Sequence, residues 1–385
     1  MPAIDLAYLS QRKLHLHKDG VTRTLESEFE RTVRERTASI ERRNSWKTQG
    51  RGATFQGAAG LAQQAASRQT PVLITGLTLA PEGGLLYSLE TDSISGIFLR
   101  DAAGVETRLF HTADFRIRHA ALHSDGATLA ATAFHNDSMR SNIALLPLHG
   151  TDFSEVTEGD SFDQLPAWVP GGGRRVVFQS AGVGRDAAGN FAGLGPCTIH
   201  RLDAESGDLD EIAAEDGKDL LQPRETEDGT LYYIRKPYES GAPQASLLGS
   251  IGDAAMFPFR MARAILQYFN IFSMMYTGKP LVTNKGAVQR PIDPRQALIY
   301  GNLAHAMMQQ QQGDDDQQGL VPSSWELVRK RPGERAETVA KNVLAFDVAG
   351  ERVVCSNGRS IQAIGPDGHS QRLLEGELID RIVAL

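Results

Sequence analysis

The sequence predicts an all-β protein: a six-bladed β-propeller closed by pairing of its C-terminal strand with its N-terminal blade, with an α-helical insertion in the fifth blade. Three observations lead to this fold. A strand–turn–strand pattern recurs along the chain, the first thirty residues resemble the last thirty, and 38 glycines fall mostly in short turn clusters. Many Gly-containing turns between short apolar runs favour strands over long helices.

The repeat consists of a short strand, a turn containing glycine, and an apolar strand, followed by a second strand pair. The turn glycines Gly83, Gly126, Gly172 and Gly229 are spaced 43, 46 and 57 residues apart. The next one, Gly350, follows 121 residues later, which is one period plus a long insertion. Four strands in a period of this length are typical of a propeller blade, which buries its faces only against its neighbours. The segments that carry the repeat are 77–92, 120–137, 166–182, 223–239 and 344–358.

The two ends of the chain are expected to form one shared blade. Residues 4–27 supply three strands but no innermost one, and the final strand, 379–385, has no later strand to pair with. Pairing the two closes the ring and removes its open edges. The closing blade therefore comprises 1–27 and 377–385. The other blades, within 70–239 and 323–376, are expected at 70–113, 116–158, 163–213, 219–340 and 343–376.

Two of these repeats resemble those of the TolB-like six-bladed propellers. They are PAWVPGGGRRVVFQSAG (166–182) and AALHSDGATLAATAFHND (120–137), with a strand, a Pro-Asp-Gly-type turn and a strand that ends in Ser. The family's Trp-Ser-Pro-Asp-Gly appears here only as the variant Trp-Val-Pro-Gly-Gly at 168–172. The repeat is also similar to WD-repeats, but no Trp-Asp dipeptide ends a blade. TolB is periplasmic and has an additional domain, and neither feature is visible in this sequence.

Charge and cysteine content narrow the function classes. A net charge of −7 and a pI near 5.8 disfavour nucleic acid as a partner, because neutralising phosphates needs a basic face. Cys197 and Cys355 lie in no metal-binding or redox spacing, so two reduced thiols are expected. The N-terminus lacks the apolar core of a signal peptide. The expected location is the cytoplasm of a bacterial cell, with peripheral contact at the inner membrane as a variant.

Residues 28–69 are predicted to form a helix followed by a linker. Phe29, Val33 and Ile40 fall near one face of the helix, and charged residues cover the others. This face is expected either to pack on the propeller rim or to dock a partner. The following stretch is small and polar, as is typical of a linker.

The insertion at 240–322 contains a strongly apolar predicted helix at 256–276. Its polar positions, Arg260, Arg263, Gln267 and Asn270, form one narrow stripe. Such a helix is not expected to stay exposed to water. Three arrangements remain open: packing against a second predicted helix at 294–312, docking a protein partner, or lying in a membrane interface with the arginines at the headgroups. The residues expected to make the partner or membrane contact are Phe257, Phe259, Arg260, Arg263, Leu266, Phe269, Phe272, Met274 and Met275.

The sequence contains no recognisable catalytic motif. It has no Gly-x-Ser-x-Gly elbow, phosphate loop or dinucleotide fingerprint, and we predict no cofactor and no metal. His15 and His17 share a strand face, but surface histidines are a simpler interpretation than a metal pair. The expected innermost strands offer His119, His123 and Asp347 to the channel. The acidic run 314–316 lies in a low-complexity tract, 309–319. A Gly-rich loop at 185–195 either borders a ligand site at a channel mouth or is a plain loop.

The leading functional hypothesis is a non-enzymatic protein-interaction scaffold, because propellers present loops from several blades on one rigid face. A propeller with an insertion in blade five is also similar to the propeller members of bacterial systems that pair a MoxR-type AAA+ ATPase with a von Willebrand A protein. That resemblance implies these two proteins as partners. The alternatives are a membrane-surface adaptor that uses helix 256–276, and a propeller enzyme of the lactonase or lyase type with a metal in its channel.

Overall fold

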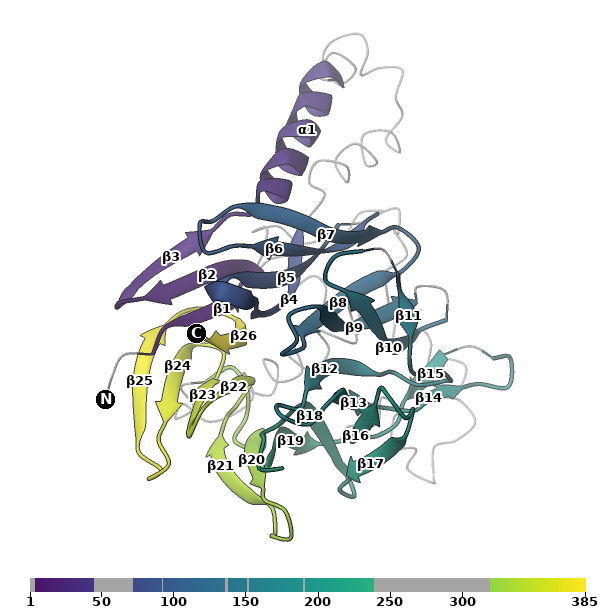
Figure 1. The fold of residues 1–385 in the computed structure, drawn as a ribbon, viewed down its shortest axis with the longest axis vertical. Helices are drawn as coiled ribbons and strands as arrows, with labels where there is room; N and C mark the ends of the chain where they lie inside the picture. The colour runs from purple at the N-terminus through teal and green to yellow at the C-terminus, as the bar shows by residue number, and fades with distance from the viewer. Residues whose placement is uncertain are drawn as a thin grey trace, which may run out of the picture. The chain divides into compact units, whose positions relative to one another are not determined.

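A computed structural model describes residues 4–44, 72–91, 93–135, 138–150, 152–189, 191–238 and 319–385. Six four-stranded antiparallel sheets surround a common centre (Figure 1). This arrangement confirms the predicted all-β, six-bladed propeller. The predicted insertion at 240–322 lies outside the described residues except for its last four positions. Among the described helices, none has the length and apolar character needed to cross a membrane.

Each blade is a meander that runs from its innermost to its outermost strand. Blade 1 contains β26 (Ile379–Ala384), β1 (Leu6–Ser10), β2 (Lys13–Lys18) and β3 (Val21–Leu25), and blade 2 contains β4 (Leu73–Leu79), β5 (Leu85–Glu90), β6 (Ser95–Arg100) and β7 (Glu106–Thr112). Blade 3 contains β8 (Arg116–Leu122), β9 (Thr128–His135), β10 (Arg140–Pro147) and β11 (Ser154–Glu155), and blade 4 contains β12 (Gln164–Trp168), β13 (Arg175–Ser180), β16 (Thr198–Asp203) and β17 (Leu209–Ala213). Blade 5 contains β18 (Lys218–Glu225), β19 (Leu231–Pro237), β20 (Glu326–Lys330) and β21 (Glu337–Lys341), and blade 6 contains β22 (Ala345–Ala349), β23 (Arg352–Ser356), β24 (Ser360–Ile364) and β25 (Ser370–Glu375).

The chain ends close the ring, as predicted. β26 pairs antiparallel with β1, with Leu6 opposite Ala384 and Tyr8 opposite Ile382, and the two strands lie side by side in Figure 1. The Leu385 amide donates to the Asp5 carbonyl at 3.0 Å, which continues the pairing past the strand end. Each innermost strand also contacts the innermost strands of both neighbouring blades, so the ring is complete.

Burial follows strand position within each blade. All six residues of β5 are buried, because both faces of a middle strand lie against neighbouring blades. The first four residues of β3, an outermost strand, are exposed. This gradient explains why the middle strands are continuously apolar while the outer strands carry charges.

Serines at the ends of middle strands tie adjacent blades together. The Ser95 hydroxyl in blade 2 both accepts from the Ile117 amide and donates to the Ile117 carbonyl in blade 3. The Ser356 hydroxyl in blade 6 donates to the Ile379 carbonyl of β26 at 3.0 Å. A hydroxyl that satisfies backbone groups of the next blade accounts for the recurring Ser seen in the sequence.

Candidate functional site

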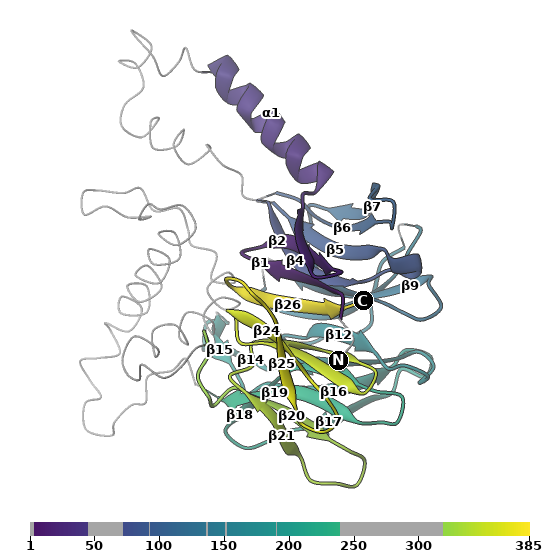
Figure 2. The same cartoon turned by 90° about the vertical axis from the view of Figure 1, so that its left-hand side faces the viewer.

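Connections between strands lie on two opposite faces of the propeller. Because neighbouring strands run antiparallel, the connections that follow outermost strands and those between the two middle strands share one face, which we call the insertion face. The chain leaves the propeller on this face after β3 and after β19, and it returns there before β4 and before β20. The hairpin of β14 (Val183–Arg185) and β15 (Phe191–Leu194) lies on the same face, and both chain termini lie on the opposite one (Figure 2). The predicted loop at 185–195 therefore includes the end of β14 and all of β15, and forms most of a β-hairpin.

The Glu106 carboxylate on β7 holds the start of helix α1 (Glu28–Asn44). It accepts hydrogen bonds from the Ser27 hydroxyl at 3.0 Å and from the backbone amides of Glu28 and Phe29 at 3.1 and 2.9 Å. The Tyr87 hydroxyl donates to the same carboxylate. Burial, followed by the hydrogen bond and the charge of Glu106, raises the pKa of Tyr87 well above its ordinary range. A carboxylate at a helix N-terminus satisfies free amides and complements the helix dipole.

The first turn of α1 also packs on blade 2. The Phe29 ring lies 5.2 Å from the Phe98 ring of β6, centroid to centroid. The expected packing of the Phe29 position on the propeller is therefore present. The Ile40 side chain, which belongs to the same predicted stripe, is not among those described.

The two strands that border the insertion in blade 5 are also anchored. Where β19 ends, the Tyr238 hydroxyl donates to the Leu194 carbonyl of the β14–β15 hairpin at 2.6 Å. Where the chain returns, the Leu320 amide donates to the Asn357 carbonyl at 2.7 Å, and the Asn342 side-chain amide donates to the Val321 carbonyl at 2.9 Å. Leu320 and Val321 are buried, so the propeller resumes at these residues.

The nine residues predicted to contact a partner or membrane lie outside the described residues. They are Phe257, Phe259, Arg260, Arg263, Leu266, Phe269, Phe272, Met274 and Met275. Their role stays a prediction, as does that of the helix at 294–312.

Ionisable side chains from different blades lie near one another on and beside the innermost strands. We call Arg12, His119, Arg224, Asp347, Asp380 and Arg381 the axial cluster. Arg12 lies in the β1–β2 turn, and the other members belong to the innermost strands β8, β18, β22 and β26. Two contacts within the cluster are ion pairs: Arg12 Nη2 lies 3.5 Å from Asp380 Oδ2, and Arg224 Nε lies 3.8 Å from Asp347 Oδ1.

His119 occupies a bulge in its innermost strand. Its φ of 52° is left-handed, and the pairing of β8 with β9 shifts register at this point. A Cβ on Gly76 of the neighbouring blade 2 would lie 2.7 Å from the backbone nitrogen of His119, so only glycine permits this close approach of the two strands. Burial, then the charge of Arg381 and those of three further arginines, holds the pKa of His119 well below its ordinary value. The ring is therefore neutral at pH 7.

His119 Nδ1 is one of the buried polar atoms without a hydrogen-bond partner in the described structure. A neutral imidazole carries one donor and one acceptor nitrogen. This nitrogen can therefore form a hydrogen bond with a bound molecule or with water.

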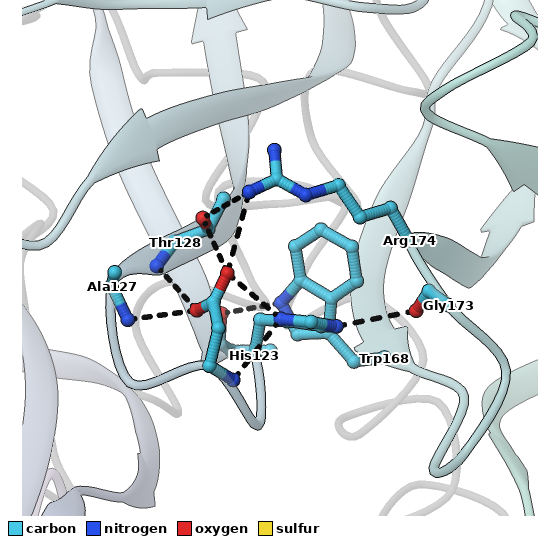
Figure 3. Close-up of polar contacts among 8 residues, drawn as sticks. His123, Ala127, Thr128, Trp168, Gly173 and Arg174 are labelled. Carbon is cyan, nitrogen blue, oxygen red and sulfur yellow. Dashed lines mark hydrogen bonds and ion pairs between the residues drawn. The ribbon is translucent and has the colours of Figure 1, made fainter.

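The predicted channel histidines separate into two places. His119 belongs to the axial cluster, whereas His123 lies in the turn after β8, on the face opposite the insertion face. The His123 ring packs edge-on against Trp168 of blade 4, with ring centroids 4.6 Å apart (Figure 3). Trp168 Nε1 donates to the Ala121 carbonyl, and Arg174 Nη2 lies 3.4 Å from Asp125 Oδ2. The tryptophan and the Asp-Gly turn that carry the TolB resemblance thus join two blades.

The remaining sequence candidates have local partners. The His15 ring stacks on Tyr8 with centroids 5.0 Å apart, and His17 Nδ1 lies 2.9 Å from the Thr22 hydroxyl. Across the described part of the chain, no group of three or more His, Cys, Asp or Glu side chains is arranged to hold a metal ion. Cys197 and Cys355 are buried and unpaired, and burial raises the pKa of both thiols.

Most of the axial cluster is not among the residues predicted from the sequence. The prediction includes His119 and Asp347 but not Arg12, Arg224, Asp380 or Arg381. The available signal was the presence of charges inside two innermost strands, in PRETEDG and IDRIVAL. A charge in the most enclosed strand of a blade is unusual, because burying it is costly unless it is paired.

Comparisons with known proteins concern the fold. No family model and no curated protein matches the sequence. Among solved structures, TolB from Acinetobacter baumannii is similar with a TM-score of 0.51 and 12% identity, over 99% of this chain and 66% of that one. A chain of the nidogen/laminin complex gives a TM-score of 0.50 and 8% identity, over 99% and 98%. A putative TolB from Agrobacterium tumefaciens gives 0.45 and 13%, over 98% and 92%. The predicted TolB-like six-bladed propeller fold is confirmed.

Proposed function

We propose that this protein is a protein-interaction scaffold that binds its partners on the insertion face. The observation that carries the proposal is the placement of the two long excursions of the chain. Both leave the propeller and return to it on one face, and their attachment points are fixed by Glu106, Tyr238 and Leu320. A rigid ring that carries long segments on one face is well suited to hold several proteins together.

The composition of the blade-five insertion supports a partner that offers an apolar surface. The predicted helix 256–276 carries Phe269, Phe272, Met274 and Met275 close together in sequence, and few charges. Aromatic residues and methionine are enriched at protein interfaces, and methionine adapts to irregular grooves. Arg260 and Arg263 would lie at the polar rim of such a contact.

The proposed partner class follows from the sequence resemblance. A MoxR-type AAA+ ATPase and a von Willebrand A protein would be held together by the propeller, which itself would carry out no chemistry. Membrane binding through helix 256–276 is the competing use of the same segment, and the experiment below separates the two.

The test is an affinity capture from soluble and membrane fractions of the source cell. The intact protein is compared with a variant in which 241–317 is replaced by a short Gly-Ser linker. Tyr238, Leu320 and Val321 stay in place, because they belong to the propeller. A second variant, Phe269→Ser with Phe272→Ser, keeps the insertion but removes apolar surface. Circular dichroism and thermal melting check that each variant still folds.

The proposal predicts that defined proteins are captured by the intact chain and lost from both variants. Recovery of membrane vesicles alone, lost in the same way, would replace the scaffold with a membrane adaptor. Recovery of the same proteins by all three forms would contradict a role for the insertion.

A further inference from the structure

We propose that the axial cluster is a binding site for a small oxyanion, a carboxylate or a phosphate group, held by guanidinium groups from blades 1 and 5. This site is independent of the insertion and of the partners proposed above.

Arg381 lies in the innermost strand β26, opposite Leu9 of β1. Within the described ranges its guanidinium makes no hydrogen bond and no ion pair with a neighbouring side chain. Burial lowers the pKa of Arg381 to about 10; the charge of the adjacent Asp380 raises the pKa, and the charges of Arg224 and Arg12 lower it. At pH 7 the group is still protonated, so a half-buried positive charge on the innermost strand has no hydrogen-bonded partner among the described residues.

The two aspartates of the cluster already have ion-pair partners. Arg12 is paired with Asp380 and Arg224 with Asp347, which leaves Arg381 without a carboxylate of its own among the described ion pairs. Burial also raises the pKa of Asp347, which disfavours its negative form. The nearby Arg118 is already neutralised by Glu90, whose two carboxylate oxygens accept from Arg118 Nε and Nη2 at 2.9 and 2.8 Å. The Arg381 guanidinium is therefore the member of the cluster whose donors are left for a ligand.

The cluster keeps contact with solvent although its members lie on innermost strands. The side chains of Arg224 and Asp347 are 30% and 19% exposed, and that of Asp380 is 20% exposed. Groups that are desolvated and still partly accessible are expected to line an opening along the axis. A small anion can reach such groups, whereas the fully covered Arg118–Glu90 pair is closed to it.

Three neighbouring guanidinium groups destabilise the fold by repulsion but can serve to recognise an anion. Like charges repel, and apolar side chains of similar volume often stabilise a fold as well as or better than buried ions. Guanidinium groups bind carboxylates and phosphates through paired N–H donors in a fork geometry. His119 Nδ1, which lacks a partner, adds one further polar contact on the same axis. The arrangement fits an oxyanion with two or more acceptor oxygens.

The test is isothermal titration of the full-length protein with sodium phosphate and, separately, with sodium citrate at matched ionic strength, using sodium chloride as the blank. Arg381→Gln is the test variant, and Arg224→Gln repeats it from another blade. Arg372→Gln is the matched control, because Arg372 lies on the outer strand β25, is 57% exposed and pairs with the exposed Glu375.

We expect one of the two anions to bind the unaltered protein, with at least a tenfold loss of affinity in Arg381→Gln and in Arg224→Gln and no change in Arg372→Gln. Which anion binds distinguishes a carboxylate ligand from a phosphate ligand. Absence of binding by both anions, or equal binding by Arg381→Gln and Arg372→Gln, would overturn the proposal.

A melting experiment gives a second, separate readout. In chloride buffer, Arg381→Met should melt at a higher temperature than the unaltered protein, because it removes an unpaired buried charge. Adding the bound anion should raise the melting temperature of the unaltered protein but not that of Arg381→Met. A variant that melts lower and still responds to the anion would show that Arg381 serves the fold rather than the ligand.

Discussion

Arg118 on β8 and Glu90 at the end of β5 form a two-pronged ion pair that joins blades 2 and 3, with side chains 5% and 6% exposed. The Arg118 guanidinium also lies over the Phe134 ring, 5.3 Å from its centroid. Because both side chains are buried, each charge is stabilised by the other rather than by water. The pair therefore fixes the approach of two blades at the inner end of the sheet.

Removal of one member of this pair should be costly. Glu90→Ala leaves a buried guanidinium without its counter-charge, and we expect a loss of about 3–5 kcal/mol in the free energy of unfolding. The double change Glu90→Leu with Arg118→Met should cost less than the single one, because no charge is left buried. Urea unfolding followed by circular dichroism measures both. The control, Glu375→Ala, breaks an exposed pair with Arg372 and should cost about 1 kcal/mol or less. Equal losses at Glu90 and Glu375 would refute this account.

Loss of the Glu106 carboxylate should loosen the start of helix α1. Glu106→Ala leaves the Ser27 hydroxyl and the amides of Glu28 and Phe29 without their acceptor. Of the three residues only Ser27 is buried, and a buried unsatisfied donor costs about 1–3 kcal/mol. Hydrogen exchange should accelerate at the Glu28 and Phe29 amides. Glu205→Ala, at an exposed turn, is the control. Unchanged exchange in Glu106→Ala would mean that other contacts hold the helix.

Asp125 should make the stability of the blade 3–blade 4 junction depend on pH. Burial alone raises the pKa of this carboxyl, but hydrogen bonds from Ala127, Thr128 and His123 outweigh it and bring the pKa to about 2. An unfolded Asp titrates near about 3.9. Its stabilising contribution is thus complete above about pH 4 and disappears as the pH falls through about 2.

The measurement is the stability difference between the unaltered protein and Asp125→Asn, determined by urea unfolding at several pH values. This difference should shrink as the pH falls below about 4. Asp367→Asn, at an exposed turn where the carboxylate accepts from the His369 amide, serves for comparison. A difference that does not change with pH would rule out the proposed hydrogen-bonded carboxylate.

Gly76 should tolerate no side chain. An added Cβ would lie 2.5 Å from the Ser88 hydroxyl and 2.7 Å from the His119 nitrogen, which forces β4 away from the bulge in β8. We expect Gly76→Ala to lower the melting temperature clearly. Gly182→Ala, where no atom lies within 4 Å of the new Cβ, should be neutral or slightly stabilising. Similar melting temperatures for the two variants would contradict the close approach of these strands.

The sequence carried enough information for the fold because local chemistry repeats in every blade. Gly83, Gly126 and Gly229 have φ values of 77°, 66° and 79°, which only glycine adopts without strain. Glycine therefore marks these turns in the sequence, and their spacing gives the length of the repeat. The closing strand was predictable because the N-terminal repeat lacked an innermost strand.

The axial cluster could not be predicted in the same way. Arg12, Arg224 and Arg381 are far apart in sequence. They come near one another only because bulges and strand register place the β1–β2 turn, β18 and β26 around one axis. A bulge shifts every later side chain by one position, and no local signal reports it. His119 and Asp347 could be proposed as channel residues because histidine and aspartate are common metal ligands. Arginine is not a metal ligand, so arginines in strands did not indicate a site.

Crosslinking mass spectrometry of the captured complex tests the central claim, binding at the insertion face, most directly. Lysines mark the two faces: Lys13 and Lys341 lie at strand ends on the insertion face, and Lys18 and Lys330 lie at strand ends on the opposite face. The account predicts partner crosslinks to Lys13 and Lys341 that are lost when 241–317 is replaced. Crosslinks confined to Lys18 and Lys330 would place the partner on the wrong face and contradict the account.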